Sequence, residues 1–174
     1  HRIFVDSKTG VTGAGVKPKT VTHFPNVNDN FKPYSIQSHR HTIEIQEVLS
    51  HSSGQEAVIQ FTPHLLPVDR GILTSIYLIP QGEMNQTELT ELYHRYYGAE
   101  HFIRLRNHPP EIKQVRGTNY TDIYASYDDR TQHILIFTAL DNLVKGAAGQ
   151  AVQNMNLMLG FDEQEALDAI PLMP

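Results

Sequence analysis

The stretch AVIQFTPHLLPVDRGILTSIYLI, from Ala57 to Ile79, decides the fold class. It holds two runs rich in β-branched and aromatic residues, Ala57–Thr62 and Ile72–Ile79, and each run predicts a strand. The PHLLPVDRG segment that joins them contains two prolines and a glycine, which predicts an irregular connection. Two strands in succession, without a helix between them, do not fit the regular strand-helix alternation of a doubly wound sheet.

The segments on either side of this stretch predict the remaining elements. Further strands are expected over Arg2–Asp6, Phe102–Arg106, Thr121–Tyr127 and His133–Thr138, and helices over Ser38–Ser50, Asn85–Tyr97 and Asn142–Leu159. The order strand, helix, paired strands, helix, strand, hairpin, helix predicts an α+β domain with a mixed, mostly antiparallel sheet and helices on one face. Because 174 residues suit a single core, residues 1–174 are expected to form one domain.

Two of the predicted helices carry recognisable end signals. Ser38 is the expected N-cap of the first helix. The apolar side of that helix is expected to carry Ile43, Ile45, Val48 and Leu49. The Asn85–Tyr97 helix has good start chemistry, and Gly98 is expected to end it.

The composition excludes several classes of protein. A net charge of −5 gives no general attraction to nucleic acid, and no apolar run reaches the roughly 18 to 20 residues that span a bilayer. The segment HRIFVDSKTG at the N-terminus lacks the apolar stretch of a signal peptide. The absence of cysteine excludes a disulfide, cysteine-ligated zinc and a thiol nucleophile within these residues, and it fits a reducing compartment.

The segment His39-Arg40-His41 is a candidate for chemistry, with Glu44 three residues further on. On a strand, both imidazole rings would lie on one face and suit a metal ion. On a helix, positions i and i+2 point roughly 200° apart, which disfavours two ligands on one ion. A neutral histidine near a carboxylate can also act as a general acid or base. The plainest interpretation is a solvated helix start, and spacing alone leaves all three open.

Two loops contain residues that could contact an anion. Gly10, Gly13 and Gly15 can present successive backbone N–H groups to an anion, or they form an ordinary flexible loop. Arg70, next to a glycine on a loop that leaves the sheet, could clamp a carboxylate or phosphate. A surface arginine is the alternative interpretation of Arg70.

The segment DNLVKGAAGQAVQNMNL begins the last predicted helix, and Asp141 or Asn142 can cap it. Lys145 and several small residues lie near the positive end of this helix, so that a ligand or another backbone could approach closely. Asn142 could hydrogen-bond to an amide of a ligand. A tightly packed pair of helices explains the same residues equally well.

Four segments occur together and in order: SKTGVTGAG, HRHTIEI, FTPHLLPVDRGIL and DNLVKGAAGQAVQNMNLMLGF. In combination they resemble the C-terminal part of the N-acetyl-gamma-glutamyl-phosphate reductases. The resemblance implies a semialdehyde dehydrogenase-type dimerisation domain. It also implies the NADPH-dependent reduction of N-acetyl-glutamyl phosphate to N-acetyl-glutamate semialdehyde, an oxidoreductase step of arginine biosynthesis in the cytoplasm.

The chemistry that the resemblance implies needs two further parts. In this family a Rossmann domain binds NADP, and a cysteine thiolate attacks the acyl phosphate. The 174 residues contain neither a cysteine nor a dinucleotide-binding fingerprint. The resemblance therefore implies a catalytic and dimerisation domain without its Rossmann half, inactive by itself, and a homo-oligomer formed through the sheet.

The resemblance also implies roles for individual residues. His39 or His41 would be the acid/base oriented by Glu44, with His41 preferred, and no metal is expected. The substrate-binding positions would be Ser7, Gly10, Gly13, Gly15, His64 and Arg70. The positions near the cofactor would be Asn142 and Lys145. The competing hypothesis is a non-enzymatic module that binds a small anionic metabolite or a partner chain.

Overall fold

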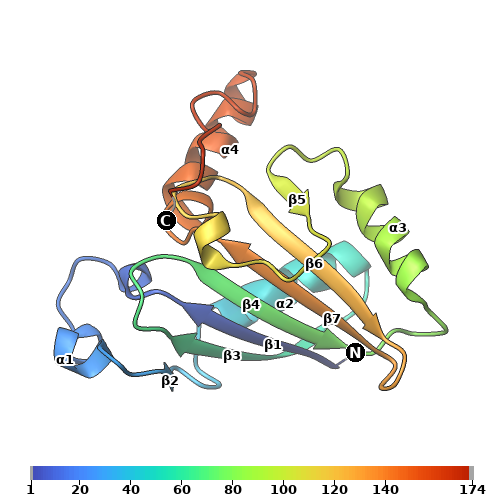
Figure 1. The fold of residues 1–174 in the computed structure, drawn as a ribbon, viewed down its shortest axis with the longest axis horizontal. Helices are drawn as coiled ribbons and strands as arrows, with labels where there is room; N and C mark the ends of the chain where they lie inside the picture. The colour runs from blue at the N-terminus through green and yellow to red at the C-terminus, as the bar shows by residue number, and fades with distance from the viewer. Residues whose placement is uncertain (1, 173–174) are drawn as a thin grey trace.

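A seven-stranded sheet forms the centre of the structure, a computed structural model in which residues 2–172 are described (Figure 1). The strands are β1 (Arg2–Thr9), β2 (Lys32–Pro33), β3 (Val58–Leu65), β4 (Ile72–Leu78), β5 (Ile103–Leu105), β6 (Thr121–Asp128) and β7 (His133–Leu140). Their order across the sheet is β2-β3-β1-β4-β7-β6-β5. Of the six pairings, only β1–β3 and β5–β6 are parallel. The predicted mixed, mostly antiparallel sheet is confirmed.

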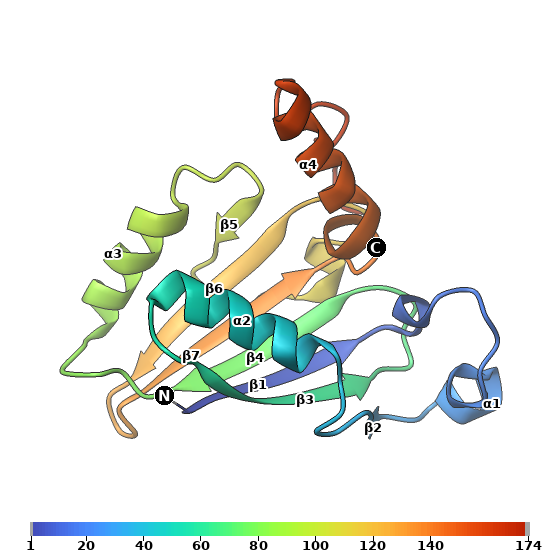
Figure 2. The same cartoon turned by 180° about the vertical axis from the view of Figure 1, so that it is seen from behind.

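The two longest helices beside the sheet cover the same face. The helices are α1 (Phe24–Val27), α2 (His41–Ser53), α3 (Gln86–Tyr97) and α4 (Gly149–Leu159). Figure 2 shows α2 lying across the sheet and α3 beside β6, whereas α4 projects from the end of the sheet. The prediction of helices on one face is confirmed for α2 and α3.

Two apolar clusters explain why α2 and α3 lie there. The cluster under α3 consists of Leu89, Ile123, Tyr127, Ile134 and Ile136. The cluster under α2 consists of Val5, Ile59 and Phe61, against which Ile45 and Leu49 of α2 pack. Ile76 of β4 contacts both clusters, because strand alternation puts paired residues of neighbouring strands on one face. The two clusters therefore form one layer under both helices.

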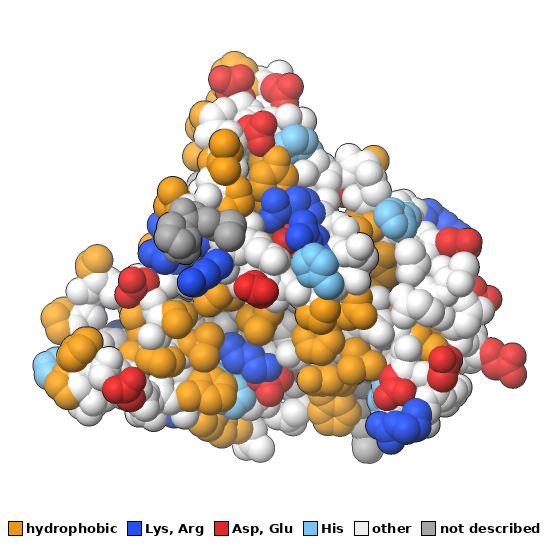
Figure 3. Space-filling model, viewed as in Figure 1, with side chains coloured by type: hydrophobic (Ala, Val, Ile, Leu, Met, Phe, Trp, Pro, Cys, Tyr) orange, Lys and Arg blue, Asp and Glu red, His pale blue; other side chains and the backbone are white. Residues whose placement is uncertain are grey.

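Within residues 2–172, the other face of the sheet carries no α-helix, and it exposes large apolar side chains (Figure 3). Phe4 is 50% exposed, Val58 is 51% exposed and Tyr77 is 37% exposed. A polar group interrupts this face: the Asp6 carboxylate lies 2.9 Å from Lys8 Nζ and 3.1 Å from His64 Nδ1. We call this surface the open face. No helix within residues 2–172 is long and apolar enough to cross a membrane.

The segment PHLLPVDRG is more regular than its prolines predict. β3 continues through Pro63 to Leu65, so the prediction of an irregular connection is wrong for these residues. The N–H of Leu66, just after β3, donates to the Thr9 carbonyl of β1. Because N–H groups alternate along a strand, position 63 faces β2, the neighbour on the opposite edge of β3. Pro63 has no N–H to donate to β2, which is only two residues long, so the strand tolerates the proline. Its carbonyl accepts the N–H of Tyr34.

Candidate active site

A cavity of about 650 Å³ opens where three segments meet. Its wall is made by the loop after β1, by the residues that lead into α2, and by the residues that follow β7. Ser7, the predicted glycines of the loop, His39, His41 and Asn142 all contribute to this wall. The structure therefore brings together residues that lie more than 130 positions apart in the sequence.

The first turn of α2 differs from its prediction in a way that matters for the cavity. The helix begins at His41, and Ser38 is not its N-cap. Instead, the His39 ring lies just before the helix, where its Nδ1 accepts the backbone N–H of His41 at 3.3 Å. The two imidazole rings are 4.7 Å apart, centre to centre. Because His39 lies outside the helix, the expected divergence of positions i and i+2 does not apply to this pair.

The surroundings of His39 favour its neutral form. Burial lowers the pKa of His39, and the charges of His41 and Arg40 lower it further, against a smaller opposing effect of Glu44. Since Nδ1 accepts a hydrogen bond from the backbone, the neutral ring carries its proton on Nε2. The ring packs edge-on against Phe61, with centroids 5.3 Å apart. His39 is thus a fixed ring with one available N–H group.

His41 and Glu44 make a looser pair. His41 Nε2 lies 3.8 Å from Glu44 Oε2, and the two side chains are 47% and 65% exposed. An ion pair at that distance and exposure gives little orientation. Glu44 does not belong to the cavity wall. Within residues 2–172, no group of three or more histidine, aspartate or glutamate residues could hold a metal ion.

The glycine loop forms a wall of the cavity, but its N–H groups are already used. Residues Val11–Ala14 form a 3-10 turn. The N–H of Gly10 donates to Gly71 at 2.9 Å, and those of Gly13 and Gly15 donate to carbonyls inside the loop. Each of the three glycine N–H groups has a carbonyl acceptor in this structure, and binding of an anion by this loop stays a prediction. A Cβ at Gly10 would lie 2.7 Å from the Asp69 carbonyl oxygen, so this position requires glycine.

Two of the predicted substrate contacts lie away from the cavity. His64 is on the open face, where it pairs with Asp6 and stacks on Phe31 with ring centres 5.0 Å apart. Arg70 Nη2 donates to Asp141 Oδ1 at 2.9 Å. Neither residue belongs to the cavity wall. The alternative interpretation of Arg70 as a plain surface arginine is also wrong, since its partner is fully buried.

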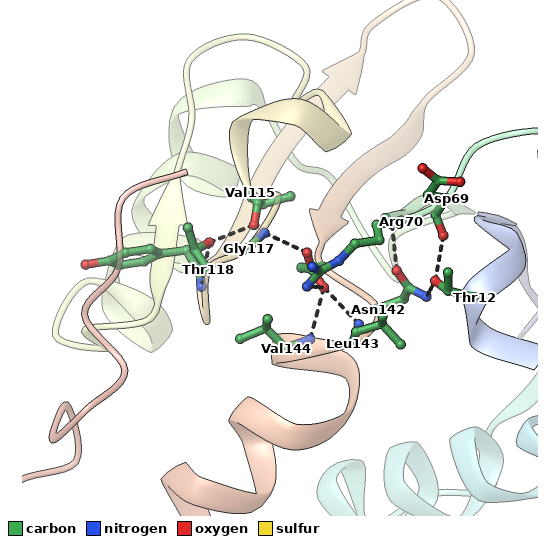
Figure 4. Close-up of polar contacts among 12 residues, drawn as sticks. Thr12, Asp69, Arg70, Val115, Gly117, Thr118, Asn142, Leu143 and Val144 are labelled. Carbon is green, nitrogen blue, oxygen red and sulfur yellow. Dashed lines mark hydrogen bonds and ion pairs between the residues drawn. The ribbon is translucent and has the colours of Figure 1, made fainter. Parts of the chain in front are cut away.

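Asp141 joins three segments below the cavity (Figure 4). Its Oδ1 accepts the N–H groups of Leu143 and Val144 at 2.8 and 2.9 Å, and its Oδ2 accepts that of Gly117 at 2.6 Å. Burial by itself raises the pKa of Asp141, but these hydrogen bonds and Arg70 outweigh it and hold the pKa below its usual value. The N-cap residue of the π-helical turn Val144–Ala148 is Leu143, so the expectation that Asp141 or Asn142 is the N-cap is wrong, although Asp141 accepts two N–H groups at the start of this turn.

Asn142 and Lys145, the residues predicted near the cofactor, point in different directions. Asn142 accepts from the N–H of Gly71 at 2.7 Å and donates to the Thr12 hydroxyl at 2.9 Å. Lys145 donates to Gln153 at 2.7 Å and is not part of the cavity wall. Burial lowers the pKa of Lys145, partly opposed by the charges of nearby glutamates. A cofactor contact by either residue stays a prediction.

The two charged residues of the cavity wall were not predicted as site residues from the sequence. Lys19 and Arg40 belong to this wall, and no aspartate or glutamate of the described residues does. Neither cation forms an ion pair with another residue in the described range. An acid-free wall with two cations suits an anionic ligand, although the whole chain has a net charge of −5. Their signal in the sequence is their place close to Gly15 and His39.

Comparison with known families assigns the fold. The sequence model of the semialdehyde dehydrogenase dimerisation domain matches residues 1–142. The chain belongs to this family. The matched range contains the sheet, α2, α3 and the glycine loop, and residues 143–172 with α4 lie beyond it.

The dimerisation domain also has close relatives among curated proteins. It is 48% identical over 175 residues to the N-acetyl-gamma-glutamyl-phosphate reductase of Methanocaldococcus jannaschii, a match that covers 100% of this chain and 51% of that protein. It is 49% identical over 177 residues to the reductase of Halothermothrix orenii, with the same coverage. The predicted resemblance is confirmed. The chain spans about half the length of the curated relatives it matches.

Solved structures show the same fold at low identity. Aspartate semialdehyde dehydrogenase II from Vibrio cholerae superposes with a TM-score of 0.71 at 16% identity, covering 91% of this chain and 55% of that chain. A probable aspartate-semialdehyde dehydrogenase from Pseudomonas aeruginosa gives 0.71 at 14% identity with the same coverage. The expected dimerisation-domain fold is therefore confirmed.

Proposed function

We propose that this chain is the substrate-binding and dimerisation part of an NADP-dependent reductase that converts N-acetyl-glutamyl phosphate to N-acetyl-glutamate semialdehyde. The observation that carries the proposal is the cavity, in which His39, His41, Lys19 and Arg40 share a wall without carboxylates. The 48% identity to reductases of this name supports the same substrate. The nucleophilic thiolate of the family would come from outside these 174 residues, which contain no cysteine.

His39 fits the role of proton donor better than His41 does. Its Nδ1 is held by a backbone N–H, so its Nε2–H is the group available to a ligand. Attack of a thiolate on the acyl carbon puts negative charge on the acyl oxygen, and a donor fixed beside that oxygen stabilises it. His41 is more loosely held, and it would exchange protons with solvent or substrate from the same wall.

The two cations would recognise the charges of the substrate. An acyl-glutamyl phosphate carries a carboxylate and a phosphate, and both pair well with arginine or lysine. Lys19 and Arg40 come from different segments of the wall, so each could contact one of these groups. Their charges would also draw an anion into a chain that is acidic overall.

The cofactor would be bound mainly by the remainder of the full-length protein. Within this chain the Asn142 amide is bonded to Gly71 and Thr12, and the Lys145 ammonium is bonded to Gln153. When bound, NADPH supplies the hydride that reduces the acyl carbon. This chain would therefore form one side of the space around the reacting carbon, and the cofactor itself would be held by other residues.

Two exposed apolar surfaces would be covered in the full-length oligomer. The open face, with Phe4, Val58 and Tyr77, would pack against a second copy, as the family's dimerisation role suggests. α4 and the turn after it expose Met158 at 85% and Phe161 at 56%, and they would contact the rest of the full-length protein. A cytoplasmic location stays a prediction.

Turnover by the full-length protein tests the proposal. We expect phosphate-dependent reduction of NADP with N-acetyl-glutamate semialdehyde, measured in the reverse direction. Lys19→Met should raise the KM for phosphate or semialdehyde about 10-fold, as loss of a charged hydrogen bond predicts. Lys17→Met is the matched control, because Lys17 lies outside the wall.

Absence of turnover, together with tight binding of acyl-glutamate ligands, would instead support a non-enzymatic binding module. Equal effects of Lys17→Met and Lys19→Met would contradict the proposed role of Lys19 in binding an anionic substrate.

A further inference from the structure

Asn142 lies where the cavity wall meets the strands, and both ends of its amide are occupied. The residue is 6% exposed. Its Oδ1 accepts the Gly71 N–H at 2.7 Å, at the entry to β4, and its Nδ2 donates to Thr12 Oγ1 at 2.9 Å in the glycine loop (Figure 4). One side chain thus connects the segment after β7 with two others.

Thr12 completes a ring of hydrogen bonds between the glycine loop and the segment before β4. Its hydroxyl donates to the Asp69 carbonyl at 2.5 Å, which leaves the oxygen lone pairs to accept from Asn142. The Thr12 N–H also donates to the Asp69 carbonyl, at 3.3 Å. The hydroxyl therefore has one position, set by Asp69 on one side and by Asn142 on the other.

The two ends of the glycine loop are held by different means. At the first end, the backbone N–H groups of Gly10 and Val11 donate to Gly71 and Val68. At the second end, a Cβ on Gly13 would lie 3.6 Å from Asn142 Nδ2, so the amide packs directly against this backbone. Asn142 therefore contacts the second end of the loop twice, by its hydrogen bond to Thr12 and by its packing on Gly13.

The neighbouring Asp141 holds the opposite wall in a related way. Its carboxylate fixes the N–H groups of Leu143 and Val144, which begin the π-helical turn Val144–Ala148. Gly146 and Ala147 of this turn belong to the cavity wall. Two adjacent residues therefore position two walls of one cavity.

We infer that Asn142 is a positioning residue, which sets the substrate wall at Thr12 and Gly13 through the Thr12 hydroxyl. The inference rests on the proposed reductase function and deepens it. It assigns Asn142 an effect on binding of the acyl phosphate, in place of the direct contact with the nicotinamide amide that the sequence suggested. Thr12 transmits this effect, since its hydroxyl contacts both Asn142 and the Asp69 carbonyl.

A double-mutant cycle in the full-length protein tests this assignment. Thr12→Val and Asn142→Ala should each raise the KM for the acyl substrate about 10-fold, with kcat changed less than about 3-fold, as expected when a wall that binds the ground state moves. The double variant should raise KM by less than the product of the two single effects, because both changes remove the same Asn142–Thr12 hydrogen bond. The KM for NADPH should stay within about 2-fold of wild type. Thr12→Ser, which keeps the hydroxyl, should restore the substrate KM.

A direct cofactor contact predicts the opposite pattern. Asn142→Ala would then raise the KM for NADPH, Thr12→Val would not reproduce it, and the two effects would add. That result would overturn the inference. Normal kinetics of Thr12→Val would overturn it as well.

Hydrogen exchange separates this inference from the proposed function. In the 174-residue chain, Asn142→Ala should speed exchange of the Gly71 amide at least about 10-fold, because that N–H loses its acceptor. An unchanged exchange rate would contradict the positioning role of Asn142, whether or not the full-length protein has reductase activity. A wild-type full-length protein without reductase activity would contradict the proposed function. The exchange result would still decide the role of Asn142 in the fold.

Discussion

Helices α2 and α3 cover the same face of the sheet, yet they begin in different ways. α3 starts with a capping box, in which Asn85 Oδ1 accepts the Glu88 N–H and Glu88 accepts the Asn85 N–H, each at 3.0 Å. Its Leu89 is 1% exposed. α2 has no side-chain cap from its N-cap residue Arg40 and contains no buried residue.

The difference shows what each helix contributes. The start of α3 satisfies its own backbone N–H groups and places Leu89 in the core, so it contributes to the stability of the fold. The start of α2 presents His39 and His41 to the cavity, and the His39 ring takes the place of a conventional cap.

The largest expected effect is on the core under α3. Leu89→Ala should lower the free energy of unfolding by about 3 kcal/mol, because it leaves a cavity in a fully buried site. Val48→Ala in α2, at a side chain 65% exposed, should cost less than about 0.5 kcal/mol. Urea unfolding of the 174-residue chain measures both values. Similar losses in the two helices would contradict the comparison.

The next effect is the alkaline response of α3. Burial, with a smaller contribution from Tyr97, raises the pKa of Tyr93 to about 12. In the unfolded chain the phenol titrates near its ordinary pKa of about 10. The stabilisation is therefore complete below about pH 10 and is lost as the pH rises through the folded pKa. Unfolding measured at increasing pH should show this loss in wild type and a smaller one in Tyr93→Phe.

The caps of the two helices give a smaller difference. Asn85→Ala removes the capping box and should cost about 1 kcal/mol of unfolding free energy. Ser38→Ala should be close to neutral, since Ser38 caps no helix. Thermal or urea unfolding of the two variants measures the contrast. A Ser38→Ala loss as large as that of Asn85→Ala would restore the cap position expected from the sequence.

The acid response of the α2 start is the smallest effect. Because burial and then His41 and Arg40 lower the pKa of His39, the folded chain binds this proton later than the unfolded chain does. The contribution to stability is full above the unfolded pKa of about 6.5 and is lost as the pH falls through the folded pKa. An NMR titration of the His39 ring should give a midpoint below 6.5. A midpoint above that value would contradict the neutral His39 described here.

The comparison of α2 with α3 shows which helix ends local sequence patterns predict. The α3 helix and its end at Gly98 follow from local signals, and the structure agrees, with Asn85 as the N-cap of the helix. The start of α2 was misplaced by three residues, because an imidazole that accepts a backbone N–H has no established sequence signal. Strand patterns predicted six of the seven strands, whereas the two-residue β2 is too short to show such a pattern.

Much of the candidate site depends on contacts that sequence spacing does not encode. Arg70 meets Asp141 across 71 positions, and Asn142 meets Thr12 across 130 positions. The direction of a side chain on β3 also decided the place of His64, which alternation puts on the open face. The histidine segment was found because its residues are adjacent in the chain.

The central claim, that His39 donates a proton in this cavity, is tested most directly by replacing it with asparagine. His39→Asn keeps an acceptor near the Nδ1 position for the His41 N–H and removes the Nε2–H group. In the full-length protein we expect kcat to fall about 100-fold or more, as loss of a general acid predicts. His51→Asn, at the far end of α2, is the control and should keep wild-type turnover. Wild-type kcat in His39→Asn would contradict the account.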